Sequence, residues 1–184
     1  MKTLLCIFML AYSGLAYGGE VQIEPAASVI LTNPTDATDE VMLIRFTLPT
    51  GQGRILRATL VCPVAAQDGK DIVAWADPAP IQWTRELTTW PQWLVMKSLL
   101  SEKEGLVFEA TGEGGLEFDI SRWVRAWDDG TRTNFGVALR RVAGASGTFS
   151  FKAAGGLSKP TLRVVYRAAK PPIPTGGLEG PKSP

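Results

Sequence analysis

The chain has 184 residues, which suits one ordinary domain and is short for two. Its 19 basic and 18 acidic side chains nearly cancel, so bulk charge does not favour a partner such as duplex nucleic acid. The sequence contains no histidine, which excludes Ser-His-Asp and Cys-His catalytic relays and histidine-containing zinc sites. Paired carboxylates can hydrolyse a glycosidic bond without histidine, so a small glycan-active enzyme stays among the alternatives.

Residues 1–18 have the features of a secretory signal. Lys2 supplies a positive start, and residues 4–11 are almost wholly apolar. Ala16 and Gly18 place small residues where a signal peptidase inspects the chain, so we expect cleavage after Gly18 and a secreted, cell-surface or periplasmic protein. A membrane anchor is the alternative, but this apolar run and every later one are shorter than the roughly 20 residues that a membrane span needs.

Alternating apolar residues put every second side chain on one face and predict strands in the first half of the mature chain. Residues 20–32 contain Pro25 and are expected to form an edge strand or two short strands. After a polar connector over residues 33–40, the runs 41–48 and 54–64 are joined by a turn rich in proline and glycine, so we expect a hairpin. The side chains expected to face inward are Met42, Ile44, Phe46, Leu48, Leu56, Ala58, Leu60, Cys62 and Val64.

The two cysteines provide no disulfide to the mature chain. Cys6 lies in the predicted signal and leaves with it, so Cys62 has no partner cysteine. Because Cys62 falls on the inward side of its strand, we expect a buried and unreactive thiol.

The middle of the chain is expected to contain two strands separated by a loop. Residues 72–75 and 106–110 each have the composition of a strand. Between them, Pro91 argues against a helix because it lacks the N–H group that a helix interior needs. We therefore expect a strand and a long loop over residues 81–93, followed by at most a helical turn within residues 94–104.

One short helix is expected to interrupt the strands. Ile120, Val124 and Trp127 recur at helical spacing and so share one face. Gly130 tolerates the left-handed conformation in which helices often end. We expect a helix over about residues 121–128, between strands, closing an open end of the fold.

The remaining strands and turns complete an all-β domain. Residues 149–151 and 160–168 alternate, whereas residues 170–184 contain five prolines and three glycines and are expected to be a disordered tail or linker. Short strands separated by turns every ten or so residues predict a jelly-roll β-sandwich over residues 19–169.

Several segments in this order resemble one known family. They are LIRFTLPTGQGRILRATL at 43–60, WTRELTTW at 83–90, FDISRWVRAWDDGTRTNFGVALR at 118–140 and KPTLRVVYR at 159–167. Together they resemble the DNRLRE-type domain, which is related to disaggregatase-associated carbohydrate-binding modules and similar in outline to TGF-β propeptide-like jelly rolls. The resemblance implies a secreted, noncatalytic β-sandwich of the kind attached to surface proteins and polysaccharide-active enzymes.

The six tryptophans invite a carbohydrate-binding interpretation, because aromatic faces stack on sugar rings. Helical spacing favours a packing role for Trp123 and Trp127. Trp90 and Trp93 flank a proline in the expected loop, where binding residues concentrate, and they are our candidate ligand-binding aromatics.

Arginines are concentrated near the expected helix. Arg122, Arg125 and Arg132, with Arg140 and Arg141 nearby, would bind the carboxylates of an acidic polysaccharide if they converged. The alternative is a solvated face on which these arginines pair with neighbouring aspartates.

A calcium site is a weaker candidate. Asp128, Asp129 and Asn134 offer the hard oxygen ligands that calcium prefers, although their spacing does not match an EF-hand loop. We expect no other cofactor.

The leading hypothesis is a secreted noncatalytic module that binds polysaccharide or another cell-surface component. The alternative is a structural or assembly protein of the cell envelope that meets protein partners through its sheet faces or its proline-rich tail. A glycan-active enzyme is the third hypothesis, and no feature of the sequence selects a catalytic pair of carboxylates.

Overall fold

The structure is a computed structural model. It describes residues 19–63, 65–66, 72–101, 103–110, 116–141, 149–151 and 159–167. The predicted signal over residues 1–18 and the predicted tail over residues 170–184 lie outside the described residues.

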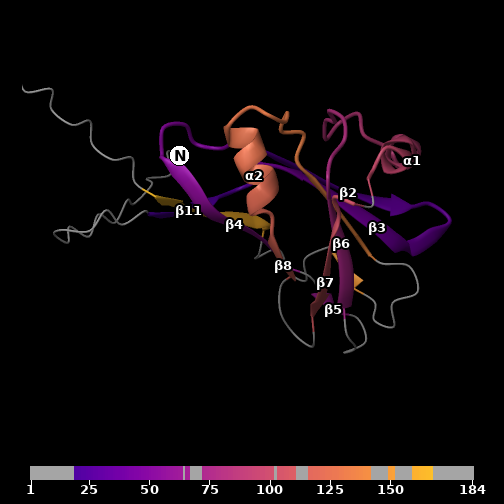
Figure 1. Ribbon diagram of the computed structural model, residues 1–184. Coiled ribbons are helices and arrows are strands. Elements are labelled where there is room, and N and C mark those ends of the chain that lie inside the picture. Colours follow the sequence, from indigo (N-terminus) through magenta and orange to yellow (C-terminus); the bar gives the residue numbers. More distant parts are fainter. Residues whose placement is uncertain are drawn as a thin grey trace, which may run out of the picture.

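The described strands form two larger antiparallel sheets and one small one (Figure 1). The first, which we call the β4 sheet, has the order β1 (Glu20–Ile23), β11 (Thr161–Arg167), β4 (Arg54–Cys62), β8 (Leu116–Asp119). The second, the β3 sheet, has the order β2 (Ala27–Asn33), β3 (Asp36–Arg45), β9 (Val137–Arg141), β6 (Ile72–Pro78), β7 (Leu106–Ala110). The strands β5 (Ala65–Ala66) and β10 (Phe149–Ser150) pair in the small sheet.

Four of the strand pairs are nested in the sequence. Antiparallel ladders join β1 to β11, β3 to β9, β4 to β8, and β6 to β7, so each pair encloses the next. A long hairpin wrapped into two facing sheets gives this arrangement, which is that of a jelly roll. The predicted fold class, an all-β sandwich with a short helix, is therefore confirmed.

The predicted hairpin between residues 41–48 and 54–64 is wrong. The strand β3 pairs with β2 and β9, whereas β4 pairs with β11 and β8, so residues 46–53 cross from one sheet to the other. The alternation was still informative, because the inward side chains of both strands meet in the main core between the sheets. This core includes Met42, Ile44, Phe46, Ala58, Leu60 and Cys62.

A β-bulge reverses the facing of side chains at the start of β4. Val165 of β11 lies opposite Arg57, but the next residue, Tyr166, lies opposite Ile55, so Leu56 has no partner in the register. An extra residue in one strand inverts the alternation beyond it. As a result Ile55 is buried and Leu56 is 40% exposed, which corrects the prediction that Leu56 faces inward.

Cys62 lies in the main core as predicted. Its side chain is fully buried, with Sγ 3.8 Å from the sulfur of Met42. Burial disfavours the thiolate and raises the pKa of Cys62 to about 12, so this thiol is unreactive at neutral pH.

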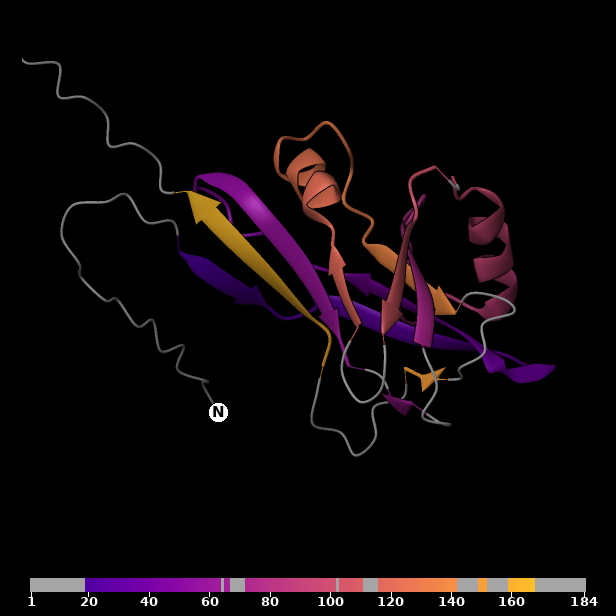
Figure 2. The same cartoon turned by 60° about the horizontal axis from the view of Figure 1, so that its bottom comes forward.

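The predicted helix is present as α2 (Ser121–Asp128), which packs against β4 (Figure 2). Val124 and Trp127 enter the main core, as their spacing predicted. Beyond the end of the β8 ladder, α2 supplies the hydrogen bonds that β4 still requires. The buried Ala58 donates its N–H to Ser121 Oγ at 2.8 Å and accepts at its carbonyl from the N–H of Ile120 at 3.0 Å.

Ser121→Ala is expected to lower the free energy of unfolding by about 1–3 kcal/mol, because it leaves the buried N–H of Ala58 without an acceptor. Ser121 Oγ also donates to Asp119, and this hydrogen bond is the main cause of a lowered Asp119 pKa. A lowered carboxyl pKa stabilises the fold at neutral pH, and this contribution is lost as the pH falls through the folded-state pKa. The decrease in the free energy of unfolding caused by Ser121→Ala should therefore be larger at neutral pH than in acid.

Urea denaturation at several pH values would measure this difference. Ser98→Ala is the matched control, because Ser98 is exposed and its hydroxyl contacts the carbonyl of Val95 within the same helix. Equal effects of the two substitutions would contradict a structural role for the Ser121 hydroxyl.

The expected loop around Pro91 is wrong, because residues Trp90–Ser98 form a helix, α1. Pro91 lies in its first turn, where backbone N–H groups have no partner within the helix, so a proline is tolerated there. The N–H of Thr89 donates to Gln92 Oε1 at 2.8 Å and fixes the start of the helix.

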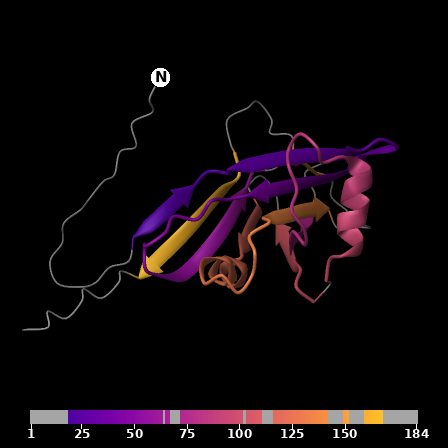
Figure 3. The ribbon, with the colours of Figure 1, turned by 90° about the horizontal axis from the view of Figure 1, so that it is seen from above.

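The helix α1 covers the outer face of the β3 sheet. Alternate residues of β3 point to opposite faces, so Met42 and Ile44 enter the main core while Val41 and Leu43 face α1. Seen from above, α1 lies at the end of the molecule away from β1 and β11 (Figure 3). A second core fills the space beneath it, formed by Leu31, Val41, Leu43, Ala79, Trp83, Trp93, Met96 and Ala138.

Candidate functional site

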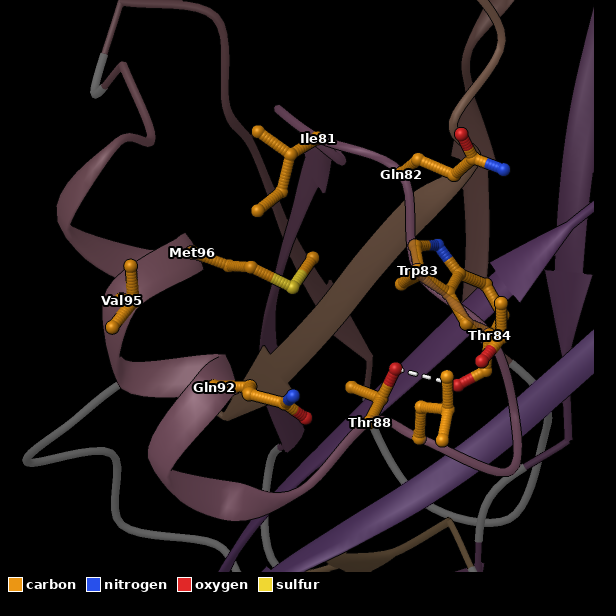
Figure 4. A pocket seen from close by; sticks show the side chains of 9 residues that line it. Ile81, Gln82, Trp83, Thr84, Thr88, Gln92, Val95 and Met96 are labelled. Carbon is orange, nitrogen blue, oxygen red and sulfur yellow. Dashed lines mark hydrogen bonds between the residues drawn. The ribbon is translucent and has the colours of Figure 1, made fainter.

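An apolar hollow of about 340 Å³ lies between α1 and the segment 81–88, and we call it the α1 hollow. Figure 4 shows Met96 extending from α1 toward Trp83, with Ile81 on one side and Gln92 and Thr88 on the other. The lining residues are Ile81, Gln82, Trp83, Thr84, Leu87, Thr88, Gln92, Val95 and Met96.

The rim of the α1 hollow is mostly apolar and open to solvent. Leu87 is 70% exposed, Val95 60% and Ile81 39%. Single exposed apolar residues are ordinary, but several around one hollow mark an interaction site. Ligand sites are typically concave and mostly apolar with a few polar groups, and their volumes run from about 300 to 1,000 Å³. The α1 hollow meets this description at the small end of the range.

Two local features form the floor of the hollow. Trp83 is 3% exposed and donates its indole N–H to the carbonyl of Phe135 at 2.7 Å, which fixes the ring. The Thr88 hydroxyl donates to the carbonyl of Thr84, which closes the intervening residues into a turn.

The tryptophans predicted to bind a ligand lie beside this hollow but do not form an open aromatic surface. Trp93 is 2% exposed and belongs to the second core. Trp90, the first residue of α1, is half-buried against the same core. Trp123 and Trp127 are buried in the main core.

The candidate arginines separate into two places. Arg132 Nη1 lies 2.7 Å from Glu104 Oε2, and Arg122 donates to the Glu104 carbonyl at 3.3 Å, so these two meet at one residue. Arg125 instead donates to the carbonyl of Leu56 at 2.8 Å, where the β-bulge frees that group from the ladder. The three guanidinium groups therefore do not converge on one site.

A buried carboxylate that sequence reasoning did not select lies at Asp77. Its Oδ2 is 3.1 Å from Arg140 Nε, and its Oδ1 accepts from the Trp75 indole at 2.8 Å. The Arg140 guanidinium also lies over the Trp75 ring, 4.9 Å from its centre. Burial raises the pKa of Asp77, while these partners act in the opposite direction.

Two of the three candidate calcium ligands, Asp129 and Asn134, make hydrogen bonds within the protein. Asp129 Oδ1 accepts from both the N–H and the hydroxyl of Thr131, which lowers the pKa of Asp129. The amide of Asn134 donates to the carbonyl of Phe46 and accepts from the N–H of Gly136. In the described part of the chain, no group of three or more Asp, Glu, Cys or His side chains is placed to hold a metal ion.

No family model matches the chain, and no curated protein matches it. The resemblance to the DNRLRE-type domain stays a prediction. Within the described ranges, neither helix has the length and apolar character needed to cross a membrane.

Sequence reasoning missed the α1 hollow because it placed a loop where α1 lies. A signal for the helix was present, since Thr89 and Gln92 stand three residues apart before an apolar run, as in a capping box. With α1 recognised, Trp93 and Met96 share one face, and Val95 falls on the side left to solvent.

Proposed function

We propose that this protein is a secreted, noncatalytic β-sandwich module that binds another component of the cell surface. We further propose that this component is a protein, of which an apolar side chain enters the α1 hollow. The observation that carries the proposal is the exposed apolar rim formed by Ile81, Leu87 and Val95 around an apolar hollow.

The shape of the site favours a protein partner over a polysaccharide. A sugar ring is bound by stacking on a flat aromatic face that is open to solvent. Trp83 and Trp93 are buried, Trp90 is half-buried, and the exposed apolar side chains of the rim are aliphatic. Desolvation of an apolar side chain is the interaction that such a rim supports best.

The state of the buried carboxylate supports a noncatalytic role. Both oxygens of Asp77 are engaged, one by Arg140 and one by Trp75. A general acid needs a carboxyl that can reach the substrate, and the side chain of Asp77 is only 1% exposed.

Val95→Asp is expected to raise the dissociation constant for peptides that carry a large apolar side chain at least about tenfold. An apolar side chain that enters the hollow would remove water from a carboxylate on its rim, and this desolvation costs more than the roughly 1.4 kcal/mol that corresponds to a tenfold change. The peptides would be selected from a phage-displayed random library on the wild-type chain, and their affinities measured by isothermal titration calorimetry.

Val107→Asp is the matched control, because Val107 is 51% exposed on β7 and does not line the α1 hollow. It should leave the affinities unchanged. Peptides that bind Val95→Asp as tightly as wild type would contradict the proposal. So would retention on an acidic or insoluble polysaccharide that is lost in Trp90→Ala but kept in Val95→Asp, because that result would place sugar binding at the tryptophan.

A further inference from the structure

A second hollow, of about 500 Å³, adjoins the α1 hollow, and Thr84 lines both. Its charged lining residues are Glu24, Arg45, Arg85, Glu86 and Lys159, and we call it the cationic hollow. A ligand that fills the α1 hollow therefore extends directly toward these charges.

Among the residues that the structure describes, the arginines of the cationic hollow have no acidic partner. Lys159 Nζ lies 3.8 Å from Glu24 Oε2, which pairs one cation with one carboxylate. Neither Arg45 nor Arg85 makes an ion pair with any described residue. The charged groups that remain in the lining are the guanidinium groups of Arg45 and Arg85 and the carboxylate of Glu86. Their net charge is positive.

Trp83 connects the two hollows physically. Its ring lines the α1 hollow, and the Arg45 guanidinium lies over the same ring, 5.7 Å from its centre. A cation over an aromatic face is held by the charge distribution of the ring. The stacking limits the freedom of Arg45, so less side-chain entropy is lost when an anion binds there.

We propose that the natural ligand is a peptide segment of a partner protein in which a large apolar side chain stands next to a carboxylate. This inference rests on the proposed function. The apolar side chain occupies the α1 hollow, and the carboxylate lies beside Thr84 against Arg45 and Arg85. Guanidinium groups bind carboxylates in bidentate geometry, which adds directional specificity to the apolar contact.

The test uses three synthetic peptides and the full chain, with affinities measured by NMR titration. The first is acetyl-Gly-Asp-Phe-Asp-Gly-amide, which offers a carboxylate on either side of the apolar residue. The second replaces both Asp with Asn, and the third replaces Phe with Ala. We expect the first peptide to bind at least about tenfold more tightly than each of the others, and to weaken as the salt concentration rises.

Charge reversal identifies the cations. Arg85→Glu is the primary variant, because Arg85 is exposed and makes no ion pair with any described residue. Arg45→Lys and Arg45→Glu test the stacked residue. In Arg85→Glu the Asp peptide should lose about tenfold in affinity, whereas the Asn peptide should be unchanged. Arg45→Lys should retain most of the preference for the Asp peptide, and Arg45→Glu should lose it.

The outcomes separate this inference from the proposed function. Equal binding of the Asp and Asn peptides, both lost in Val95→Asp, would overturn the carboxylate preference and leave the apolar site standing. Binding of the Ala peptide as tightly as the Phe peptide, unaffected by Val95→Asp, would indicate an anion site alone and overturn both. No binding by any of the three peptides would overturn this inference, whatever the library selection finds.

Discussion

Trp93→Ala is expected to lower the free energy of unfolding by about 3–5 kcal/mol, the usual cost of removing a buried tryptophan side chain. Trp93 is 2% exposed and lies in the second core, between α1 and the outer face of the β3 sheet. Its removal leaves a void that the surrounding strands cannot fill without distortion. Equilibrium unfolding in urea or guanidinium, followed by far-ultraviolet circular dichroism, would measure the change.

Leu94→Ala is the control for this substitution. Leu94 is the next residue of α1 and is 49% exposed, so its truncation should change the free energy of unfolding by less than about 0.5 kcal/mol. Similar losses in the two variants would mean that α1 does not bury Trp93 in solution. The α1 hollow would then lose its structural basis as well, because Met96 and Trp83 line it from the same core.

Asp77→Ala is expected to lower the free energy of unfolding by about 2–4 kcal/mol. Removing one member of a fully buried ion pair usually costs roughly 3–5 kcal/mol. We expect a smaller loss here because Arg140 is 24% exposed and can recover some hydration. The Trp75 indole also loses its acceptor. Thermal and urea unfolding of the variant would measure the loss, and a cost below about 1 kcal/mol would show that the pair does not hold β6 to β9.

The pH dependence of Asp77→Asn tests the same carboxylate in a second way. Because burial raises the folded-state pKa of Asp77 above its ordinary value of 3.8, the folded protein takes up this proton before the unfolded chain does. The contribution of Asp77 to stability therefore falls as the pH rises through the interval between these two pKa values. The free energy of unfolding of wild type minus that of Asp77→Asn should decrease across that interval, and a difference that increases there would contradict the raised pKa.

The sequence predicted those features of the fold that depend on local periodicity. Alternation identified the inward faces of β11 and of β4 from Ala58 onward, and the spacing of Val124 and Trp127 predicted α2. Alternation states which face of a strand is buried and not which strand lies beside it. The pairing of β3 and β4 was therefore predicted wrongly, and the bulge at Leu56 left no mark in the residue pattern.

The candidate site depended on features that local patterns do not contain. Pro91 was interpreted as a helix breaker, although the first turn of a helix accepts it. With α1 in place, Trp93 turns toward the β3 sheet while Val95 stays exposed, which reverses the expectation for the tryptophan. The two adjoining hollows are formed by segments near residues 24–28, 45, 81–88 and 159, and no local pattern brings these together.

The nested order of the strand pairs also constrains how the molecule assembles. In the innermost pair, residues 79–105 connect β6 to β7. In the outermost pair, β1 and β11 come from the two ends of the described chain. Contacts between residues remote in sequence slow the search for the native state, because the entropy of closing each loop is lost before the contact forms. Folding is therefore expected to be slow for a chain of this size. The β2–β3 hairpin, whose strands are joined by only two residues, should form first, and the nested pairs should follow outward from β6 and β7. By the same order, the amides of β1 should be the first to exchange with solvent in the native protein.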